Sequence, residues 1–443
     1  MFTKKTIRDV ELTGKTVLLR ADYNVPVAQG KITDDYRIQQ SLPTIEYLLE
    51  QKVRLVICSH LGRPTGPGDA AASLKPVAQR LSSLLGKEVV FIPDCVGPVA
   101  ENAVKNLKPG QIALLENLRY HPEEEKNDAG FAKQLASHAD IFVQDGFGVV
   151  HRAHASTEGV TKYLPSVAGL LLEKEVDTIT RVMNNPKRPL AAIIGGAKIA
   201  DKIDILHRFI EIADFVAIGG AMANTFLKAQ GVDVAASLYD KDELGVAKDI
   251  IAKGKREADR RKFTFYIPQD GVVASKIDPR AATRIVDWSA HVIADIENYP
   301  KRPPAEASRI GDHEMILDIG PFTGAFIAGA LQQVETVVWN GAMGVTEVQG
   351  IQGPVGPFAH GTDLVMEAML GQFGGGKYRP FSVVGGGDTV GYIEGRKLVG
   401  AFNHVSTGGG ASLELMAGRK LPGVEALVDK SRLPQERVVQ YTA

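Results

Sequence analysis

Glycines that follow short apolar runs are the feature of this chain with the clearest chemical meaning. In the second half, such runs end at Gly195-Gly196, Gly219-Gly220, Gly341, Gly385–Gly387 and Gly408–Gly410. A short continuous apolar run is typical of a buried parallel strand. A glycine after it lets the backbone approach a ligand, and the following helix directs its N–H groups there. Because ligands of open α/β sheets bind beyond the carboxyl ends of the strands, this half predicts a phosphate or nucleotide site built largely of backbone.

Charged residues in two of these turns fit the same chemistry. Lys198 and Lys202 follow Gly195-Gly196, and we expect them one helical turn apart at a helix N-terminus, where two cations oppose the macrodipole unless an anion binds. Asp388 follows Gly385–Gly387, where a carboxylate could hold Mg²⁺ on a polyphosphate, with Thr389 and the amides receiving phosphate oxygens. An Asp that caps the helix after a tight turn explains this last motif equally well when it is taken alone.

A second glycine-rich segment imitates a phosphate-binding loop. Residues 371–377 fit the first seven positions of a P-loop, but the eighth position requires Ser or Thr and is Tyr378. The residues before it, 365–370, are typical of a helix, whereas the motif requires a strand. We therefore predict a glycine loop without a phosphate-binding role.

Cationic and polar side chains follow successive predicted strands in the first half of the chain. They are Asp22, Asn24, Arg37, His60, Arg63, Arg119 and Arg152. Arginine recognises phosphate and carboxylate groups in a bidentate way, so several arginines at neighbouring strand ends indicate one anionic pocket. His151 and His154 could be metal ligands by type, but no third ligand has suitable spacing, and we expect hydrogen-bonding or structural roles for both.

Alternating strands and helices must position these residues. Strands are predicted at 16–20, 53–59, 89–92, 112–115 and 141–143, with amphipathic helices at 38–49 and 76–85. This rhythm is typical of a parallel sheet. A longer helix is predicted at 170–182, a boundary near Pro186, and a second αβ series from 190 to about 400.

Composition places the chain among ordinary globular proteins of two domains. A chain of 443 residues is too long for one ordinary hydrophobic core. Its contents of 44% hydrophobic and 23% charged residues are usual for a globular protein. A formal net charge of -1 gives no sign of a nucleic-acid or anionic-membrane partner. No apolar stretch is long enough for a membrane span, and Cys58 lies in an apolar run where a buried structural thiol is expected. A reduced, cytoplasmic setting is the simplest interpretation. Solvated loops are predicted at 299–304 and 350–356, and the tail 431–443 is short and polar.

Taken together, these motifs closely resemble phosphoglycerate kinase. The matching segments are residues 18–26, 59–64, 114–120, 151–157, 195–202, 337–344, 383–389 and 404–414. They occur in the order of that family over almost the whole chain. The resemblance implies an α/β fold of two Rossmann-like parallel-sheet domains joined by a helical hinge. It implies a phosphoglycerate-binding domain at 1–172, a connecting helix at 173–187, a nucleotide-binding domain at 188–405 and a C-terminal segment, 406–443, that returns to the first domain.

The resemblance also implies roles for individual residues. Phosphoglycerate would bind to Asp22, Asn24, Arg37, His60, Arg63, Arg119 and Arg152. MgADP or MgATP would lie among Gly196, Ala197, Lys198, Lys202, Gly220, Asn340, Glu347, Gly386, Gly387, Asp388 and Thr389, with Glu347 at the ribose and Asp388 at the metal. Arg37, Lys202 and the helix that begins at Gly408 and Gly409 would stabilise the transferring group.

The expected reaction is reversible phosphoryl transfer from 1,3-bisphosphoglycerate to MgADP, giving 3-phosphoglycerate and MgATP in a monomer whose domains close on the substrates. Its reacting oxygens are already ionised at neutral pH, so no general base is required. A non-catalytic relative and a dinucleotide-dependent oxidoreductase are the alternatives. This sequence has Ala221 where the family pattern has glycine, Ala342 where it has proline, and Thr346 where it has phenylalanine. These differences bear on which nucleotide the protein prefers.

Overall fold

The computed structural model describes every residue except 1, 290–308, 352, 374–377 and 432–443. Contacts divide the chain into two units, residues 1–180 with 419–443, and residues 181–418. The functional boundaries at 172, 187 and 405 stay a prediction. None of the helices within the described ranges combines the length and apolar character that a membrane span needs.

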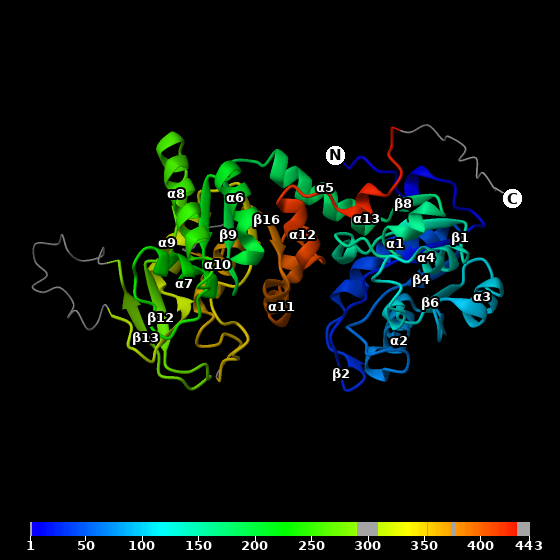
Figure 1. Ribbon diagram of the computed structural model, residues 1–443, viewed down its shortest axis with the longest axis horizontal. Helices are drawn as coiled ribbons and strands as arrows, with labels where there is room; N and C mark the ends of the chain where they lie inside the picture. Colours follow the sequence, from blue (N-terminus) through cyan, green and yellow to red (C-terminus); the bar gives the residue numbers. More distant parts are fainter. Residues whose placement is uncertain (1, 290–308, 352, 374–377, 432–443) are drawn as a thin grey trace, which may run out of the picture. The chain divides into compact units, whose positions relative to one another are not determined.

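A six-stranded parallel sheet forms the centre of the first unit (Figure 1). Its strands, in spatial order, are β5 (Val89–Ile92), β6 (Ile112–Leu115), β4 (Arg54–Cys58), β1 (Thr16–Arg20), β7 (Ile141–Gln144) and β8 (Ser166–Ala168). The predicted strands at 16–20, 89–92 and 112–115 are confirmed residue for residue, and those at 53–59 and 141–143 within one residue. Because the strands are parallel, their carboxyl ends meet at one edge.

Both faces of this sheet are buried, which explains its unbroken apolar runs. Val17 and Leu19 of β1 belong to a core shared with α1 (Tyr36–Glu50) and α2 (Lys75–Leu85). Leu18 and Cys58 point to the opposite core, with α3 (Gly97–Lys105) and α4 (Ala129–Ala136). Cys58 is a buried thiol, as predicted, and burial raises its pKa to about 12.

The second unit is built on another six-stranded parallel sheet. Its spatial order is β11 (Thr264–Tyr266), β10 (Phe215–Ile218), β9 (Leu190–Ile194), β15 (Thr336–Asn340), β16 (Phe381–Gly385) and β17 (His404–Val405). The chain runs outward from β9 in one direction and from β15 in the other, so the switch point of this Rossmann-like order lies between these two strands. Strand β17 ends at Val405, and Ser406 and Thr407 lie between it and the glycines that follow.

Helices cover this sheet on both faces. α6 (Ile203–Ile212) contacts α8 (Leu244–Arg260) and α12 (Gly409–Met416), whereas α9 (Pro321–Leu331) packs on α10 (His360–Met369). Helices α7 (Gly220–Ala229) and α11 (Gly387–Gly395) also belong to this unit. The helix predicted before the false P-loop is confirmed by α10, while residues 374–377 of that loop lie outside the described residues.

An antiparallel sheet in the second unit was not predicted. It consists of β13 (Arg284–Asp287), β12 (Asp270–Ala274) and β14 (Met315–Ile319), in that order. The sequence interpretation assigned this region to a continuing αβ series, because the strands are short and β13 buries Val286 while it exposes Ile285. The predicted loop 299–304 lies outside the described residues, as does position 352 of the loop 350–356.

Helix α5 (Leu170–Asn184) confirms the long helix predicted at 170–182, and the boundary between the units falls within it. The described C-terminal residues 419–431, which include α13 (Pro422–Glu425), belong to the first unit. Lys5 N donates to Val428 O at 2.7 Å, and Lys4 Nζ lies 2.8 Å from Asp429. Smaller elements are β2 (Val27–Ala28), β3 (Lys31–Ile32), and 3₁₀ turns at Ile7–Asp9, Ala70–Ala72, Leu118–Tyr120, Phe147–Val149, Gly159–Lys162, Ala200–Lys202 and Val399–Ala401.

Candidate active site

Arg37 is the first predicted site residue that the structure holds in a defined geometry. It lies in the first turn of α1 and its Nη1 donates to Asp22 Oδ2 at 2.9 Å and to Asn24 O at 3.3 Å. Burial acts to raise the pKa of Asp22, but Arg37, His60 and Arg20 outweigh it and hold this pKa below its ordinary value. Asp22 is therefore an ionised anchor for the Arg37 guanidinium.

His60 lies beside Asp22, with 4.0 Å between its Nδ1 and Asp22 Oδ1, and is a neutral donor. Arg20, fully buried at the end of β1, places its Nη2 3.2 Å from His60 Nδ1. A guanidinium can only donate, so Nδ1 accepts and the ring proton lies on Nε2. Burial lowers the pKa of His60 well below its usual value, although Asp22 acts in the opposite direction.

Asn117 holds two of the site loops together and was missed as a functional residue. Its Nδ2 donates to Leu61 O at 2.7 Å and to Ala72 O at 2.8 Å, while Oδ1 accepts the Arg119 N–H at 3.0 Å. The loop after β4 is thereby joined to the loop after β6. The available signal is a polar residue that directly follows an apolar strand.

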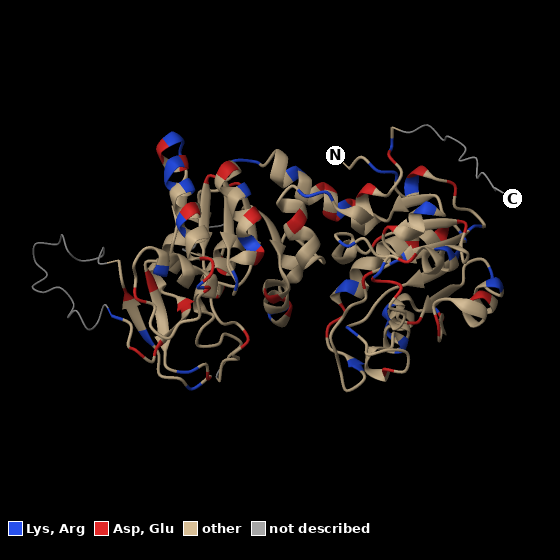
Figure 2. Cartoon of the chain, in the orientation of Figure 1, with Lys and Arg blue, Asp and Glu red and all other residues tan. Residues whose placement is uncertain are grey.

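The remaining arginines add positive charge at this edge of the sheet. Arg119 is partly buried, and burial together with repulsion from Arg152 and Arg20 lowers its pKa, whereas Glu125 raises it. Arg63 and Arg152 are exposed. Elsewhere, basic and acidic residues are interspersed over the chain (Figure 2). This local excess of cations is suited to binding a small, highly charged anion.

A buried carboxylate beneath the arginines was also missed. Glu124 accepts the Ser156 hydroxyl at 2.5 Å and the Ser156 N–H at 2.9 Å, and Arg20 Nε donates to the same Ser156 hydroxyl at 2.8 Å. Burial raises the pKa of Glu124 in spite of these donors. Glu124 therefore braces Arg20 through a shared serine.

Two histidines lie near Arg152, and a hydrogen-bonding contact is formed by the ring of His151. His151 Nε2 lies 3.2 Å from Arg152 Nε, and burial lowers the pKa of His154 to about 4. Within the described ranges, the group whose His, Cys and carboxylate atoms approach metal-binding separations is Asp94, Cys95 and His121. Its His121 Nε2 and Asp94 Oδ1 already form a contact of 2.8 Å.

In the second unit, glycines allow the turns after β9 and β15 to interlock. Gly195 N donates to Asn340 O at 2.9 Å. A Cβ on Gly195 would lie 2.1 Å from Ala342 O, and one on Gly341 2.1 Å from Gly195 O. Gly220 has a φ of +67°, in the left-handed region that favours glycine. Any larger residue at Gly195 or Gly341 would force these backbones apart.

The N-termini of two helices meet beside this interlock. α11 begins after Gly386 and α12 after Gly408, and neither N-terminus has a side-chain cap. A Cβ on Gly409 would lie 3.6 Å from Gly387 N, so the two N-termini are adjacent. Free N–H groups at two converging helix ends are an anion-binding arrangement.

The residues of the α11 turn differ in their surroundings. Asp388 is exposed in the first turn, and the cap position is Gly386, so the alternative of Asp388 as the N-cap is wrong. Thr389 is buried, and its Oγ1 accepts the Gly341 N–H at 2.7 Å. Thr389 thus joins the turns after β15 and β16, and its own O–H proton can still be donated.

Lys202 and Asn340 form the polar floor of this cradle. Lys202 Nζ donates to Asn340 Oδ1. Burial lowers the pKa of Lys202 to about 8, against the opposing effect of Asp388 and Asp201. Asn340 Nδ2 is buried and has no hydrogen-bond partner among the described residues. An unpaired buried donor next to a lysine is suited to a phosphate oxygen.

The predicted helical pairing of Lys198 with Lys202 is wrong. Residues 196–199 form an irregular bend, a 3₁₀ turn occupies 200–202, and α6 begins only at Ile203. Lys198 is exposed, whereas Lys202 is buried. Gly196, with a φ of +116°, turns the chain out of the helical path before Lys198 is reached.

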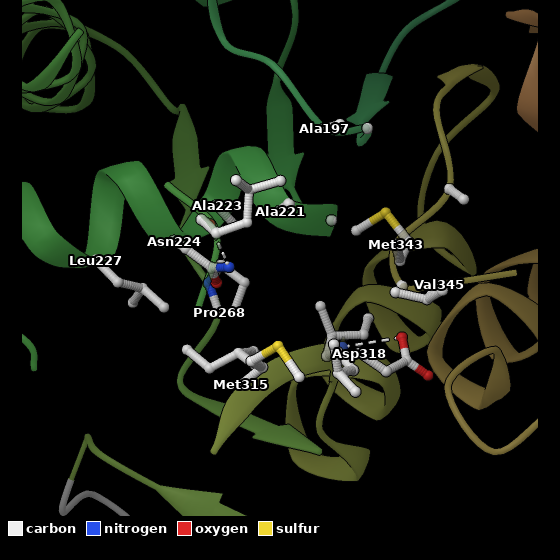
Figure 3. Close-up of a pocket in the computed structure, with 18 of the residues that line it drawn as sticks. Ala197, Ala221, Ala223, Asn224, Leu227, Pro268, Met315, Asp318, Met343 and Val345 are labelled. Carbon is white, nitrogen blue, oxygen red and sulfur yellow. Dashed lines mark hydrogen bonds between the residues drawn. The ribbon is translucent and has the colours of Figure 1, made fainter. Parts of the chain in front are cut away.

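An apolar pocket adjoins the cradle (Figure 3). Leu227 of α7, Pro268, Met315 of β14, Met343 and Val345 supply its apolar wall. Gly196, Ala197 and Asp388 lie at its border with the cradle, and Glu347 is an exposed carboxylate on its lining. Ala221 and Ala342 also line it. An apolar pocket beside an anion cradle has the form of a nucleotide site.

Two polar residues of this pocket were missed. Asn224 Nδ2 donates to Leu238 O at 2.9 Å, and the dashed line at Asn224 in Figure 3 marks this bond. Asp318 accepts the N–H groups of Gly361 at 2.8 Å and Ile319 at 2.9 Å, and burial raises its pKa well above the usual value. Asn224 bonds to a residue outside its own helix, and Asp318 lies on β14 and bonds to Gly361, which is distant in sequence. No local sequence pattern therefore predicts either role.

Comparison with known proteins gives a consistent result. The family model described as phosphoglycerate kinase matches residues 7–419. The phosphoglycerate kinase of Moorella thermoacetica is 47% identical over 427 residues, covering 96% of this chain and all of the relative. That of Pelotomaculum thermopropionicum is 46% identical with the same coverage. The structure of phosphoglycerate kinase from Coxiella burnetii is similar with a TM-score of 0.77 and 34% identity, covering 96% of this chain and 98% of the other.

Proposed function

The chain belongs to the phosphoglycerate kinase family. We therefore propose that it transfers a phosphoryl group from 1,3-bisphosphoglycerate to MgADP. The products are 3-phosphoglycerate and MgATP, and the reaction is reversible. The acceptor in the reverse direction is a carboxyl group. One observation carries this proposal: the chain has a group of arginines at the carboxyl edge of one parallel sheet and a glycine-built cradle with an apolar pocket at the corresponding edge of another.

We propose that the side chains at this edge of the first sheet bind phosphoglycerate. The proposed contacts are Asp22, Asn24, Arg37, His60, Arg63, Arg119 and Arg152. Arg63 and Arg152 are exposed, which leaves their guanidinium groups accessible to the phosphate group. His60 supplies a neutral N–H donor from Nε2, and Asp22 can accept from the substrate hydroxyl.

The cradle and the apolar pocket are proposed to bind the nucleotide through Gly196, Ala197, Lys198, Lys202, Gly220, Asn340, Glu347, Gly386, Gly387, Asp388 and Thr389. The base would occupy the apolar pocket and the ribose would lie near Glu347. Asn340 Nδ2, Lys202 and the N-terminus of α11 would bind phosphate oxygens. Asp388 is an exposed oxygen donor at that N-terminus, which fits the preference of Mg²⁺ for one carboxylate and phosphate oxygens. Bound Mg²⁺ would neutralise charge on the nucleotide phosphates.

Catalysis in this proposal depends on positioning and on charge. The attacking oxygens are ionised at neutral pH, so no residue has to remove a proton. Arg37, Lys202 and the α12 N-terminus at Gly408 and Gly409 would neutralise charge on the transferring group. Transfer brings the carboxylate and the terminal phosphate together and excludes water, so we propose that α5 acts as a hinge for domain closure.

A coupled assay tests the function directly. With 3-phosphoglycerate and MgATP, formation of 1,3-bisphosphoglycerate would be followed through its NADH-dependent reduction by glyceraldehyde-3-phosphate dehydrogenase. We expect turnover that requires both substrates and Mg²⁺. Binding of both substrates by calorimetry without turnover would instead identify a non-catalytic member of the family, and binding of NAD alone would favour an oxidoreductase.

A further inference from the structure

Asp145 is a buried carboxylate to which the reaction described above assigns no part. It follows β7 directly and is 1% exposed. Its Oδ1 accepts the N–H groups of Leu171 at 3.0 Å and Leu172 at 3.1 Å, so it caps the first turn of α5. Its Oδ2 is buried and accepts no hydrogen bond of normal geometry among the described residues.

The surroundings of Asp145 connect α5 to the substrate loops. Asp145 N donates to Arg20 O at 2.9 Å. The next residue, Gly146, packs so closely on the loop after β1 that its Cβ would lie 3.3 Å from Asp22 N. Residues 146–152 then lead to Arg152. Asp145 therefore lies where the loops bearing Asp22 and Arg152 meet the start of α5.

The start of α5 is shaped around this carboxylate. A Cβ on Gly169 would lie 2.2 Å from Asp145 Oδ1, so glycine is required there for the carboxylate to reach the helix. Leu170 N donates to Thr44 Oγ1 at 3.0 Å, which joins the same turn to α1. Helix α1 also carries Arg37, and α5 continues past residue 181, where the second unit begins.

Keeping a carboxylate at this place costs stability. Burial, with repulsion from Glu175 of α5, raises the pKa of Asp145 to about 7, although Thr44 and the two α5 N–H groups act to lower it. Tyr23, after β1, also faces Asp145. The unfolded chain releases this proton near pH 4, so the contribution of Asp145 to stability falls as pH rises from about 4 to about 7. A neutral isostere would avoid that loss, which points to a functional reason for the carboxylate.

We propose that Asp145 is a positioning residue, whose ionised carboxylate fixes the first turn of α5 to the loops that bear Asp22 and Arg152 and so couples the orientation of α5 to the substrate site. The inference rests on the proposed function, because α5 is the hinge in that mechanism. An ionised cap holds a helix N-terminus more firmly than a neutral one. Protonation, or replacement by an amide, would loosen the coupling while the substrate-binding side chains themselves stay in place.

The test compares Asp145→Asn with wild type and with Thr44→Val. At pH 8 we expect kcat of Asp145→Asn to fall about tenfold, because the amide oxygen can still accept the α5 N–H groups but lacks the charge that strengthens the cap. KM for 3-phosphoglycerate and for MgATP should stay within about twofold, and Tm should equal or exceed that of wild type. A residue with a merely structural role would not combine lower kcat with unchanged or higher Tm.

The pH profile supplies the second readout. Wild-type kcat should fall as pH drops through about 7, and Asp145→Asn should lack this inflection. Thr44→Val should keep the inflection and move it to higher pH, because Thr44 lowers the pKa of Asp145. An active wild type with an equally active Asp145→Asn overturns the inference alone, and so does a loss of kcat accompanied by lower Tm and higher KM. A wild type without turnover overturns the proposed function and the inference with it.

Discussion

The two candidate sites lie at equivalent places in their sheets and are built from different materials. In the first unit, the loops after β1, β4, β6 and β7 project charged side chains, held by buried partners such as Asn117 and Glu124. In the second, the turns after β9, β15 and β16 offer backbone N–H groups beside the Lys202 and Asn340 side chains, and close contacts leave no room for a larger residue at Gly195 or Gly341. The same kind of sheet can thus bind an anion mainly through side chains or mainly through the main chain. The two sites should therefore respond differently to mutation.

The largest effect should come from the side-chain site. Arg37→Ala removes the guanidinium that we place at the transferring group, and kcat in the coupled assay should fall by about 10²- to 10³-fold. Arg80→Ala is the matched control, because Arg80 forms an exposed ion pair with Asp35 at 2.6 Å and should change kcat little. Near-normal turnover of Arg37→Ala would remove Arg37 from the mechanism.

In the backbone site, a single methyl group should be disruptive. Gly195→Ala would place a Cβ 2.1 Å from Ala342 O, so calorimetry should show at least a roughly tenfold loss of ADP affinity, and unfolding about 1–3 kcal/mol of lost stability. Affinity for 3-phosphoglycerate should be retained. Gly391→Ala in α11 is the control, since its Cβ would meet nothing within 4 Å. Equal effects of the two substitutions would contradict a cradle defined by close backbone contact.

Asp388, like Lys202 and Asn340, is proposed to act in the backbone site through its side chain. Asp388→Ala should weaken binding of MgADP by about tenfold, the effect of one charge-assisted contact. Binding of ADP without Mg²⁺ should change much less, and binding of 3-phosphoglycerate should not change. Calorimetry in the presence and absence of Mg²⁺ measures all three, and a loss confined to 3-phosphoglycerate would refute the assignment.

The sites should also differ in their response to pH. Lys202, with its pKa lowered to about 8 by burial, loses its charge above that pH, so nucleotide affinity should fall a few-fold between about pH 7.5 and 9.5. Lys202→Arg should abolish this dependence, since arginine stays protonated. Phosphoglycerate affinity, which depends on arginines, should be flat over the same range. A parallel decline for both ligands would show that Lys202 is not responsible.

The smallest effect tests whether the two sites act together. Each substrate alone has its proposed contacts in one unit, whereas both together favour closure. The radius of gyration from small-angle scattering should therefore decrease most when 3-phosphoglycerate and a non-hydrolysable MgATP analogue are both present. An unchanged radius in a ternary complex of a catalytically active protein would contradict the hinge mechanism.

The sequence alone predicted the parallel strands with little error, because a strand buried on both faces must be apolar throughout. It also predicted the site turns, since a glycine or an arginine directly after such a strand has few structural reasons to be there. It failed at the antiparallel sheet β12–β13–β14, whose short, half-exposed strands resemble loops, and at Lys198, because the positive φ of Gly196 is not encoded in a helical pattern.

What the sequence determined, then, is the class of each element and the chemistry at its carboxyl end, because burial and backbone geometry act locally. Only the tertiary structure decided which polar groups support that chemistry. Asn117, Glu124, Asp145 and Asp318 are each buried against residues that are distant in sequence or belong to other elements. Their hydrogen bonds, and the raised pKa values of the three carboxyl groups, exist only once those elements are packed together, since desolvation and charge proximity are properties of the assembled core.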